Sequence, residues 1–121
     1  MPASEPTGGI IPRLPYDTQG DDMPLTPPAD CADMATLRAQ IDAIDTQLID
    51  LLALRARYID RAIPLKLAAG LPANTTDRVT QIIAAVREQA TTHGLDPDLD
   101  ETLWRAIIDW GIAHEAPHLP N

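Results

Sequence analysis

The stretch LLALRARYIDRAIPLK, residues 51–66, decides the fold because it forms the second half of a long amphipathic pattern. Within it and the residues before it, apolar side chains recur at steps of four and three, the spacing of one helix face. The residues of this apolar face are Leu37, Ile41, Ile44, Leu48, Leu51, Tyr58 and Ala62. Between Leu51 and Tyr58 the face is completed by Arg55, a permanent cation. A cation in such a place requires an explanation.

The composition of the chain indicates a small helical domain. At 121 residues the chain is long enough for one domain with a core, and 45% of it is hydrophobic although it contains no Phe. A core of Leu, Ile, Ala and Val suits packed helices better than a sheet. The net charge of −9 argues against sequence-independent nucleic-acid binding, which requires a basic surface.

The sequence gives no sign of membrane insertion or secretion. No run of apolar residues approaches the ~18 needed to cross a bilayer, and the N-terminus lacks the basic start and apolar segment of a secretory signal. Cys31 is the single cysteine, which excludes an internal disulfide and fits a reducing compartment. We therefore expect a soluble, cytoplasmic protein with no membrane partner.

The chain divides near residue 30. Residues 1–30 hold seven of the twelve prolines and three of the six glycines, and they show no helical period. Such a segment cannot bury enough apolar surface to offset the entropy of ordering it. We therefore expect a flexible arm over residues 1–30 and a helical domain over residues 31–121.

The first predicted helix begins at Met34, is capped by Asp33 and continues into the low sixties. Pro64 near its end would remove a backbone donor and crowd the carbonyl of Asp60. We therefore expect this helix to kink or stop close to Ile63.

The Gly, Pro and Asn content of residues 68–76 predicts a loop, and a second helix follows it. Thr76 or Asp77 can cap this helix, which ends near Thr92. Its predicted apolar face consists of Val79, Ile82, Ile83, Val86 and Ala90.

A third helix follows a turn over residues 93–97. It is opened by Pro97 or Asp98 and ends before Pro117. The residues predicted to face inward are Leu99, Leu103, Ile107 and Trp110. Because the chain shows no strand pattern, we predict an all-α fold of one long helix and two shorter ones.

The length of the first helix predicts a second subunit. A helix of roughly thirty residues spans ~45 Å, which is more than the two other helices can cover. The apolar face that remains calls for a partner, and a second copy of the same chain is the commonest one. We therefore expect an intertwined homodimer.

Four cations can be placed by helix geometry. Arg55 and Lys66 are eleven residues apart, so they lie on nearly the same face, ~16 Å apart along the axis. Their long side chains can lean together and hold a small anion. Arg38 cannot reach that ligand from the same helix, but in an antiparallel dimer it can enter the pocket of the other subunit. Arg78 can approach from the loop side.

A simpler interpretation of Arg55 is an ion pair with an acid on another helix, or a side chain that extends to water. The spacing of Lys66, Arg38 and Arg78 favours the anion pocket instead. We expect no metal, because His93, His114 and His118 lack metal-ligand spacing with acids or with Cys31. We also expect no cofactor.

The segment LRAQIDAIDTQLIDLLALRARYIDRAIPLK, residues 37–66, resembles the first helix of the all-helical chorismate mutases and of the isochorismate-pyruvate lyases built on the same fold. The matching features are the leading Leu-Arg, the Ile-Asp-x-Ile-Asp repeat, the Leu-Leu-x-x-Arg segment and the Lys eleven residues later. The similarity continues through Asp77-Arg78-Val79, Gly94-Leu95-Asp96 and IIDWGIAHE, residues 107–115. It covers about residues 31–115.

This resemblance implies a role for each cation. Arg38 from one subunit and Arg55 from the other would hold the two carboxylates of the substrate, and Arg78 would assist. Lys66 would donate to the ether oxygen. Glu115 occupies the position where many family members carry glutamine. The rearrangement of chorismate to prephenate needs no nucleophile, base or metal, so catalysis would rest on holding the reactive conformer and stabilising the developing charge.

Two positions depart from the family pattern. Glu115 can donate a hydrogen bond only when protonated, and Lys66 nearby favours its charged form. We therefore expect turnover to be best in mildly acidic solution. Val79 stands where mutases often place a glutamate that contacts the substrate hydroxyl. Pro64 also affects how Lys66 is presented.

Three functions are therefore open. The first is a chorismate mutase. The second is an isochorismate-pyruvate lyase, which would release pyruvate and leave salicylate, and the Val79 position keeps it open. The third is a helical dimerisation or regulatory module without catalysis.

Overall fold

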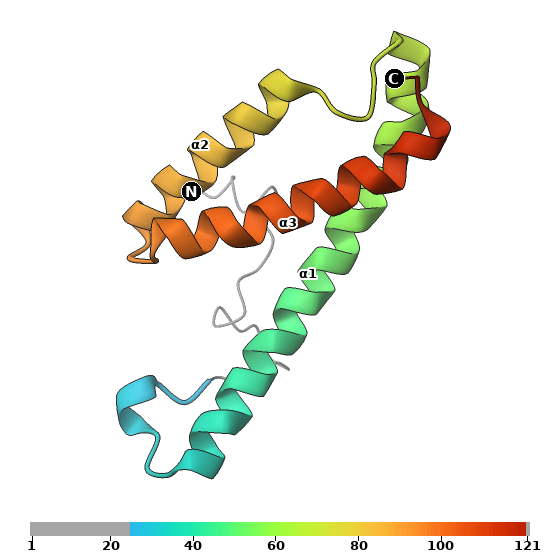
Figure 1. Cartoon of the computed structure of the whole chain (residues 1–121). Helices are drawn as coiled ribbons and strands as arrows, with labels where there is room; N and C mark the ends of the chain where they lie inside the picture. The colour runs from blue at the N-terminus through green and yellow to red at the C-terminus, as the bar shows by residue number, and fades with distance from the viewer. Residues whose placement is uncertain (1–24, 121) are drawn as a thin grey trace, which may run out of the picture. The chain divides into compact units, whose positions relative to one another are not determined.

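The computed structural model describes residues 25–120, which divide into two compact units at Leu52 and Ala53. The described elements are the short turn η3 (Pro28–Asp30), the helices α1 (Met34–Ala69), α2 (Thr76–Thr92) and α3 (Pro97–Glu115), and the turn η4 (Ala116–His118). Figure 1 shows α1 as the longest of the three helices. Residues 25–120 contain no strand. The prediction of an all-α fold with one long and two shorter helices is confirmed.

The first unit begins with a fixed turn ahead of α1. The backbone N–H of Thr26 donates to Gln40 Oε1 at 2.9 Å, and Cys31 N–H donates to the carbonyl of Pro28. Asp33 caps α1 as predicted, because its carboxylate accepts from the backbone N–H of Thr36 at 2.8 Å. Residues 1–24 of the predicted arm lie outside the described residues, so its flexibility stays a prediction.

The apolar face predicted for the first half of α1 is exposed. Its exposed members include Ile41, Ile44, Leu48 and Leu51. Apolar side chains at helical spacing that face water indicate a surface that another element covers.

The expected end of α1 near Ile63 is wrong, because α1 continues through Pro64 to Ala69. The expected kink at this position stays a prediction. Proline removes one helical hydrogen bond and crowds the carbonyl of Asp60, but Pro64 is exposed, so water can reach the backbone around it. The hydrogen bonds that end α1 do not involve Pro64. Gly70 adopts a left-handed φ of 72°, and Leu71 N–H donates to the Lys66 carbonyl at 2.9 Å.

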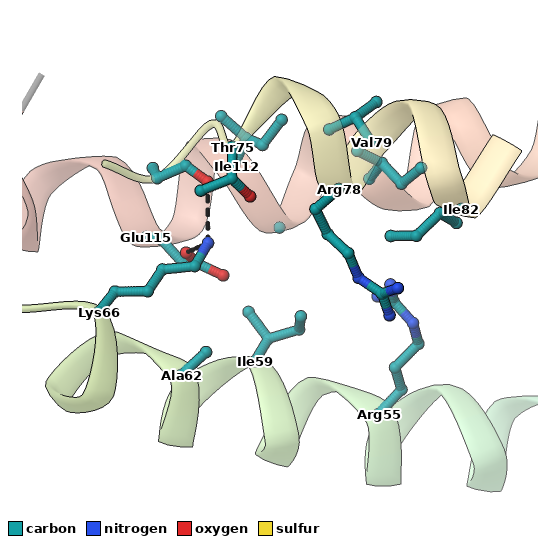
Figure 2. Close-up of a pocket in the computed structure, with 13 residues that line it drawn as sticks. Arg55, Ile59, Ala62, Lys66, Thr75, Arg78, Val79, Ile82, Ile112 and Glu115 are labelled. Atoms are coloured by element: carbon teal, nitrogen blue, oxygen red, sulfur yellow. Dashed lines mark hydrogen bonds and ion pairs between the residues drawn. The ribbon is translucent and has the colours of Figure 1, made fainter. Parts of the chain in front are cut away.

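The second half of α1 turns a mixed face towards α2 and α3. Arg55, Ile59, Ala62 and Lys66 lie on this face, as Figure 2 shows. Tyr58, which the sequence pattern placed on the same apolar stripe, is 70% exposed. Its neighbour Ile59 lines the pocket instead and lies close to Gly111 of α3.

Helices α2 and α3 form an antiparallel hairpin (Figure 1). Gly94 makes the reversal with a φ of 73°, and Leu95 N–H donates to the Ala90 carbonyl at 2.8 Å. Pro97 is the first residue of α3, as predicted, and the capping side chain is Asp96, which accepts from Asp98 N–H at 2.9 Å. Thr75 holds the capping position of α2, one residue before the predicted candidates.

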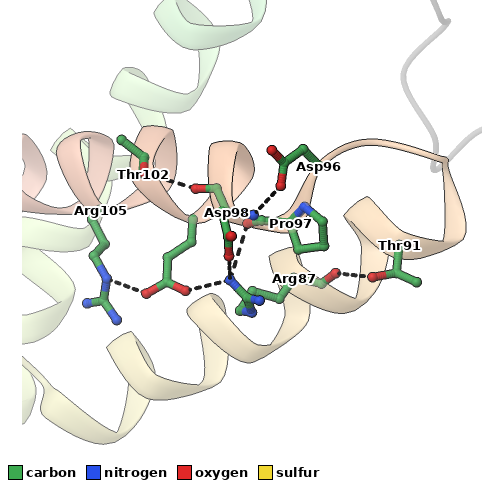
Figure 3. Close-up of polar contacts among 8 residues, drawn as sticks. Arg87, Thr91, Asp96, Pro97, Asp98, Thr102 and Arg105 are labelled. Carbon is green, nitrogen blue, oxygen red and sulfur yellow. Dashed lines mark hydrogen bonds and ion pairs between the residues drawn. The ribbon is translucent and has the colours of Figure 1, made fainter.

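Ion pairs tie the two arms of this hairpin together (Figure 3). The Arg87 guanidinium lies 3.1 Å from Asp98 and 2.9 Å from Glu101, and Arg105 lies 2.6 Å from the other oxygen of Glu101. The guanidinium groups of Arg105 and Arg87 hold the pKa of Glu101 below its ordinary value. Ion pairs as well as apolar packing therefore stabilise the hairpin near the turn that joins its two helices.

The core of the second unit is small and aliphatic. Its buried apolar residues are Ala73, Ile83, Val86, Ala90 and Ile108. The predicted face of α2 is thus confirmed at Ile83, Val86 and Ala90. The predicted face of α3 is wrong in this chain, because Leu99, Leu103 and Trp110 are exposed and the buried positions are Asp100, Ile108, Gly111 and Glu115. Apolar residues occupy more than one side of α3, so periodicity alone selected the wrong side.

Among residues 25–120, no helix is both long and apolar enough to span a membrane.

Candidate active site

The second unit contains a cavity of about 210 Å³ between α1, the α1–α2 loop, α2 and α3. Drug-sized ligands occupy pockets of roughly 300–1,000 Å³, so this cavity suits a small metabolite. Four of its charged residues come from three helices: Arg55 and Lys66 from α1, Arg78 from α2 and Glu115 from α3. Apolar side chains fill the space between them, from Ile59, Ala62, Ala73, Val79, Ile82, Ile108 and Ile112.

One end of the pocket carries two guanidinium groups. Arg55 and Arg78 extend from opposite walls, and their head groups face each other (Figure 2). Among residues 25–120, no carboxylate lies within ion-pair distance of either side chain. Two like charges that face each other without a counter-ion are unfavourable. An anion bound between them would remove this repulsion and gain charge-assisted hydrogen bonds.

The other end of the pocket holds a partly buried ion pair. Lys66 Nζ lies 2.7 Å from Glu115 Oε1, and the two side chains are 20% and 4% exposed. The same ammonium donates to the carbonyl of Ala73 at 3.0 Å. A lysine ammonium has three hydrogens, so these two contacts orient the group and leave one hydrogen for a ligand.

A second contact between α1 and α3 lies one residue from Glu115. His114 Nε2 is 2.6 Å from Asp60 Oδ1, and its ring stacks on Trp110 with centroids 4.7 Å apart. This contact ties the last turns of α3 to α1. It therefore helps to hold Glu115 at the pocket.

The structure brings together four of the five predicted site residues: Arg55, Lys66, Arg78 and Glu115. Arg38 belongs to the unit of residues 25–52 and is exposed there. Its role in the pocket of another subunit therefore stays a prediction.

Two polar contributors to the pocket, the Ala73 carbonyl and Thr75, were not predicted from the sequence. The Ala73 carbonyl is a backbone atom, so no residue type signals its role. Thr75 belongs to a loop whose composition predicted a turn without indicating which side chain enters the pocket. Within residues 25–120, no three His, Cys, Asp or Glu side chains are grouped so that they could hold a metal ion.

Comparison with known proteins identifies the family. The profile of the family described as Chorismate mutase type II matches residues 37–116, which include every residue that lines the pocket. The chain belongs to this family.

Its curated relatives have different activities. A T-protein of Enterobacter agglomerans is 35% identical over 77 residues, which are 64% of this chain but only 21% of the T-protein. An isochorismate pyruvate lyase of Pseudomonas aeruginosa is 34% identical over 89 residues, 73% of this chain and 86% of that protein. A 4-amino-4-deoxychorismate mutase of Streptomyces pristinaespiralis is 34% identical over 86 residues, covering 70% of this chain and 67% of that protein.

Proposed function

We propose that this protein is a chorismate mutase, which converts chorismate to prephenate. The observation that supports the proposal most is the pair of facing guanidinium groups of Arg55 and Arg78 at one end of a small pocket, with Lys66 at the other. A compact dicarboxylate with an ether oxygen is the kind of ligand that such a pocket complements. Membership of the type II family gives the class of substrate.

The proposed mechanism is electrostatic and conformational. The rearrangement is pericyclic, so it breaks the ether C–O bond and forms a C–C bond without a nucleophile or a base. Arg55 and Arg78 hold carboxylate and so favour the compact reactive conformer. Lys66 uses its remaining hydrogen to stabilise the negative charge that develops on the ether oxygen. Ile59 and Ile112 line the pocket and limit access of water.

The proposal includes a homodimer with shared sites. The exposed apolar face of α1, with Ile41, Ile44 and Leu48, offers a surface for a second copy. Arg38 of one subunit then completes the pocket formed by Arg55 of the other. We keep the cytoplasmic location as part of this proposal, since the single cysteine fits a reducing compartment.

The second candidate is an isochorismate-pyruvate lyase. It is favoured by the relative from Pseudomonas aeruginosa, of which this chain covers 86%. Val79 also favours it, because a valine in the pocket wall gives no carboxylate for the ring hydroxyl of chorismate. The third candidate is a helical module without catalysis. It requires that the protein keep the fold although its pocket no longer converts a substrate.

One experiment separates these candidates. The purified protein is incubated separately with chorismate, isochorismate and 4-amino-4-deoxychorismate, and the products are identified by chromatography. Prephenate from chorismate supports the mutase, whereas salicylate and pyruvate from isochorismate support the lyase. No turnover of any of the three, together with an intact fold in Arg55→Ala, would establish the non-catalytic module.

A further inference from the structure

Glu115 lies at a place in the fold that does not by itself hold a side chain still. It is the last residue of α3, and the last turn of a helix frays because its carbonyl groups have no partners within the helix. Its side chain is nonetheless only 4% exposed and pairs with Lys66 of α1, as Figure 2 shows. A buried carboxylate at the end of a helix requires a second contact that fixes that end.

The contact between His114 and Asp60 supplies this second point of attachment. His114 Nε2 lies 2.6 Å from Asp60 Oδ1 on α1. Neighbouring residues on a helix point about 100° apart, so His114 and Glu115 reach α1 from two directions around the axis of α3. Their partners Asp60 and Lys66 are six residues apart, about 9 Å along α1. Two contacts placed in this way oppose a rotation of α3 about its axis, which one contact alone would allow.

Trp110 limits the freedom of the His114 ring. The indole belongs to the preceding turn of α3, and the two rings stack with centroids 4.7 Å apart and planes inclined by 11°. Stacking of this kind holds the imidazole in one orientation, in which Nε2 reaches Asp60. A histidine donates from Nε2 to a carboxylate in its neutral form as well as when protonated, so the contact requires no uptake of a proton.

The contact itself contributes little to stability. The side chains of His114 and Asp60 are 38% and 61% exposed, and ion pairs in contact with water are weak. Its effect therefore lies in the position that it gives to Glu115, which in turn orients the ammonium of Lys66. A small displacement of a group that acts in the transition state lowers the rate even when the fold is intact.

We propose that His114, anchored on Asp60, is a positioning residue of the reaction: it holds Glu115 in the pocket and, through Glu115, the ammonium of Lys66. This inference rests on the proposed function, because it concerns the residues that act on the ether oxygen. It gives a role to two residues that do not line the pocket.

The test compares His114→Ala with His114→Gln and His118→Ala. Glutamine has an amide N–H at a reach similar to that of Nε2, so it can keep the contact with Asp60, whereas alanine cannot. His118 is the matched control, since it is an exposed histidine of η4 that does not line the pocket. The values of kcat and KM are measured separately with the substrate that the protein turns over, and melting temperatures are measured beside them.

We expect His114→Ala to lower kcat by about tenfold and to change KM by less than about twofold, because Arg55 and Arg78 still hold the carboxylate. Asp60→Ala has the same effect. His114→Gln restores most of kcat, and His118→Ala retains all of it. The melting temperatures of the four variants stay close to that of the natural protein. Equal losses of kcat in His114→Ala and His118→Ala, or a loss that His114→Gln does not restore, overturn the inference.

A double-mutant cycle shows whether His114 acts through Glu115. After Glu115→Ala no carboxylate is left to position, so adding His114→Ala to this variant should leave kcat unchanged. If the double variant instead loses a further factor of about ten, the two residues act independently and the inference is overturned.

Carbon NMR of the carboxyl groups provides a readout that needs no turnover. The Glu115 signal is the one that is missing from Glu115→Gln. In His114→Ala it should move towards the signal of Glu88, an exposed glutamate of α2, and in His114→Gln it should return. An unchanged Glu115 signal in His114→Ala overturns the inference. If the signal moves but no substrate is converted, the positioning of Glu115 stands and the proposed catalytic function fails, so the two can fail separately.

Discussion

The ammonium of Lys66 lies 2.7 Å from the carboxylate of Glu115, although 49 residues separate them in the chain. The pair joins α1 to the end of α3. It places an ammonium with one hydrogen left for a ligand at one end of the pocket, whose other end holds two guanidinium groups.

Arg55→Ala is expected to lower kcat/KM by about 10²–10³, because it removes donors aimed at a substrate carboxylate. Its stability should stay equal or rise, since the change also removes repulsion from Arg78. Steady-state kinetics and thermal unfolding check both parts. Arg57→Ala, an exposed arginine of the same helix, is the matched control and should retain activity. A loss confined to stability would contradict a binding role for Arg55.

Glu115 is expected to make activity depend on pH. A carboxyl group donates to substrate only when protonated, so kcat/KM should rise as the pH falls from about 8 to 5. Glu115→Gln donates at every pH, so its profile should be flat. Lys66 from α1 and Arg78 from α2 line the same pocket.

The neighbouring His114 requires a control, because it is a second ionisable side chain beside the pocket and pairs with Asp60. The variant His114→Asn should show the same change of kcat/KM with pH as the natural protein. If kcat/KM of the natural protein does not change between pH 5 and 8, the role of Glu115 is contradicted. If the pH dependence disappears in His114→Asn, it is caused by the histidine.

Glu101 is expected to make the stability of the α2–α3 hairpin sensitive to acid. Its folded pKa lies below the ordinary value of 4.5 because Arg105 and Arg87 donate to it. A lowered folded pKa means stabilisation that is complete above 4.5 and is lost as the pH falls through the folded pKa.

Melting temperatures measured from pH 7 down to about 3 test this expectation. Glu101→Gln should melt below the natural protein at pH 7, and the difference should shrink in acid. Glu88→Gln, an exposed glutamate of α2, is the control and should show no such convergence. A difference that is constant over the whole range would show that the carboxylate charge is not responsible.

A mixture of Arg38→Ala and Arg55→Ala subunits tests whether sites are shared. Each variant alone should be nearly inactive. If each pocket takes Arg38 from one subunit and Arg55 from the other, a mixed dimer has one intact pocket, and random mixing should restore about a quarter of the natural activity. Refolding the two variants together and assaying the mixture measures this. Activity no higher than the sum of the separate variants would exclude a shared pocket.

Much of the fold follows from local pattern. The cap of α1, the bounds of α2 and the turn before α3 depend on residues within one or two helical turns of each other, so Asp33, Gly94 and Pro97 are enough to predict them. The pocket was predictable in part for the same reason. Arg55 and Lys66 share a helix face whatever packs against it.

The buried face of α3 did not follow from pattern. Apolar residues stand on several sides of this helix, and only packing against the other helices buries Ile108 and Gly111 and leaves Leu103 and Trp110 exposed. Pro64 is a similar case. Its local preference predicted a break, but α1 continues through it and carries Lys66 to the pocket.

The sequence by itself therefore determined the number and kind of helices and the spacing of the cations along the first of them, because these depend on backbone geometry over short distances. Only the tertiary structure decided that Glu115 and the Ala73 carbonyl orient Lys66, and that Thr75 enters the pocket without capping its helix. Contacts between distant segments depend on how whole helix faces fit together, and no local pattern records that fit.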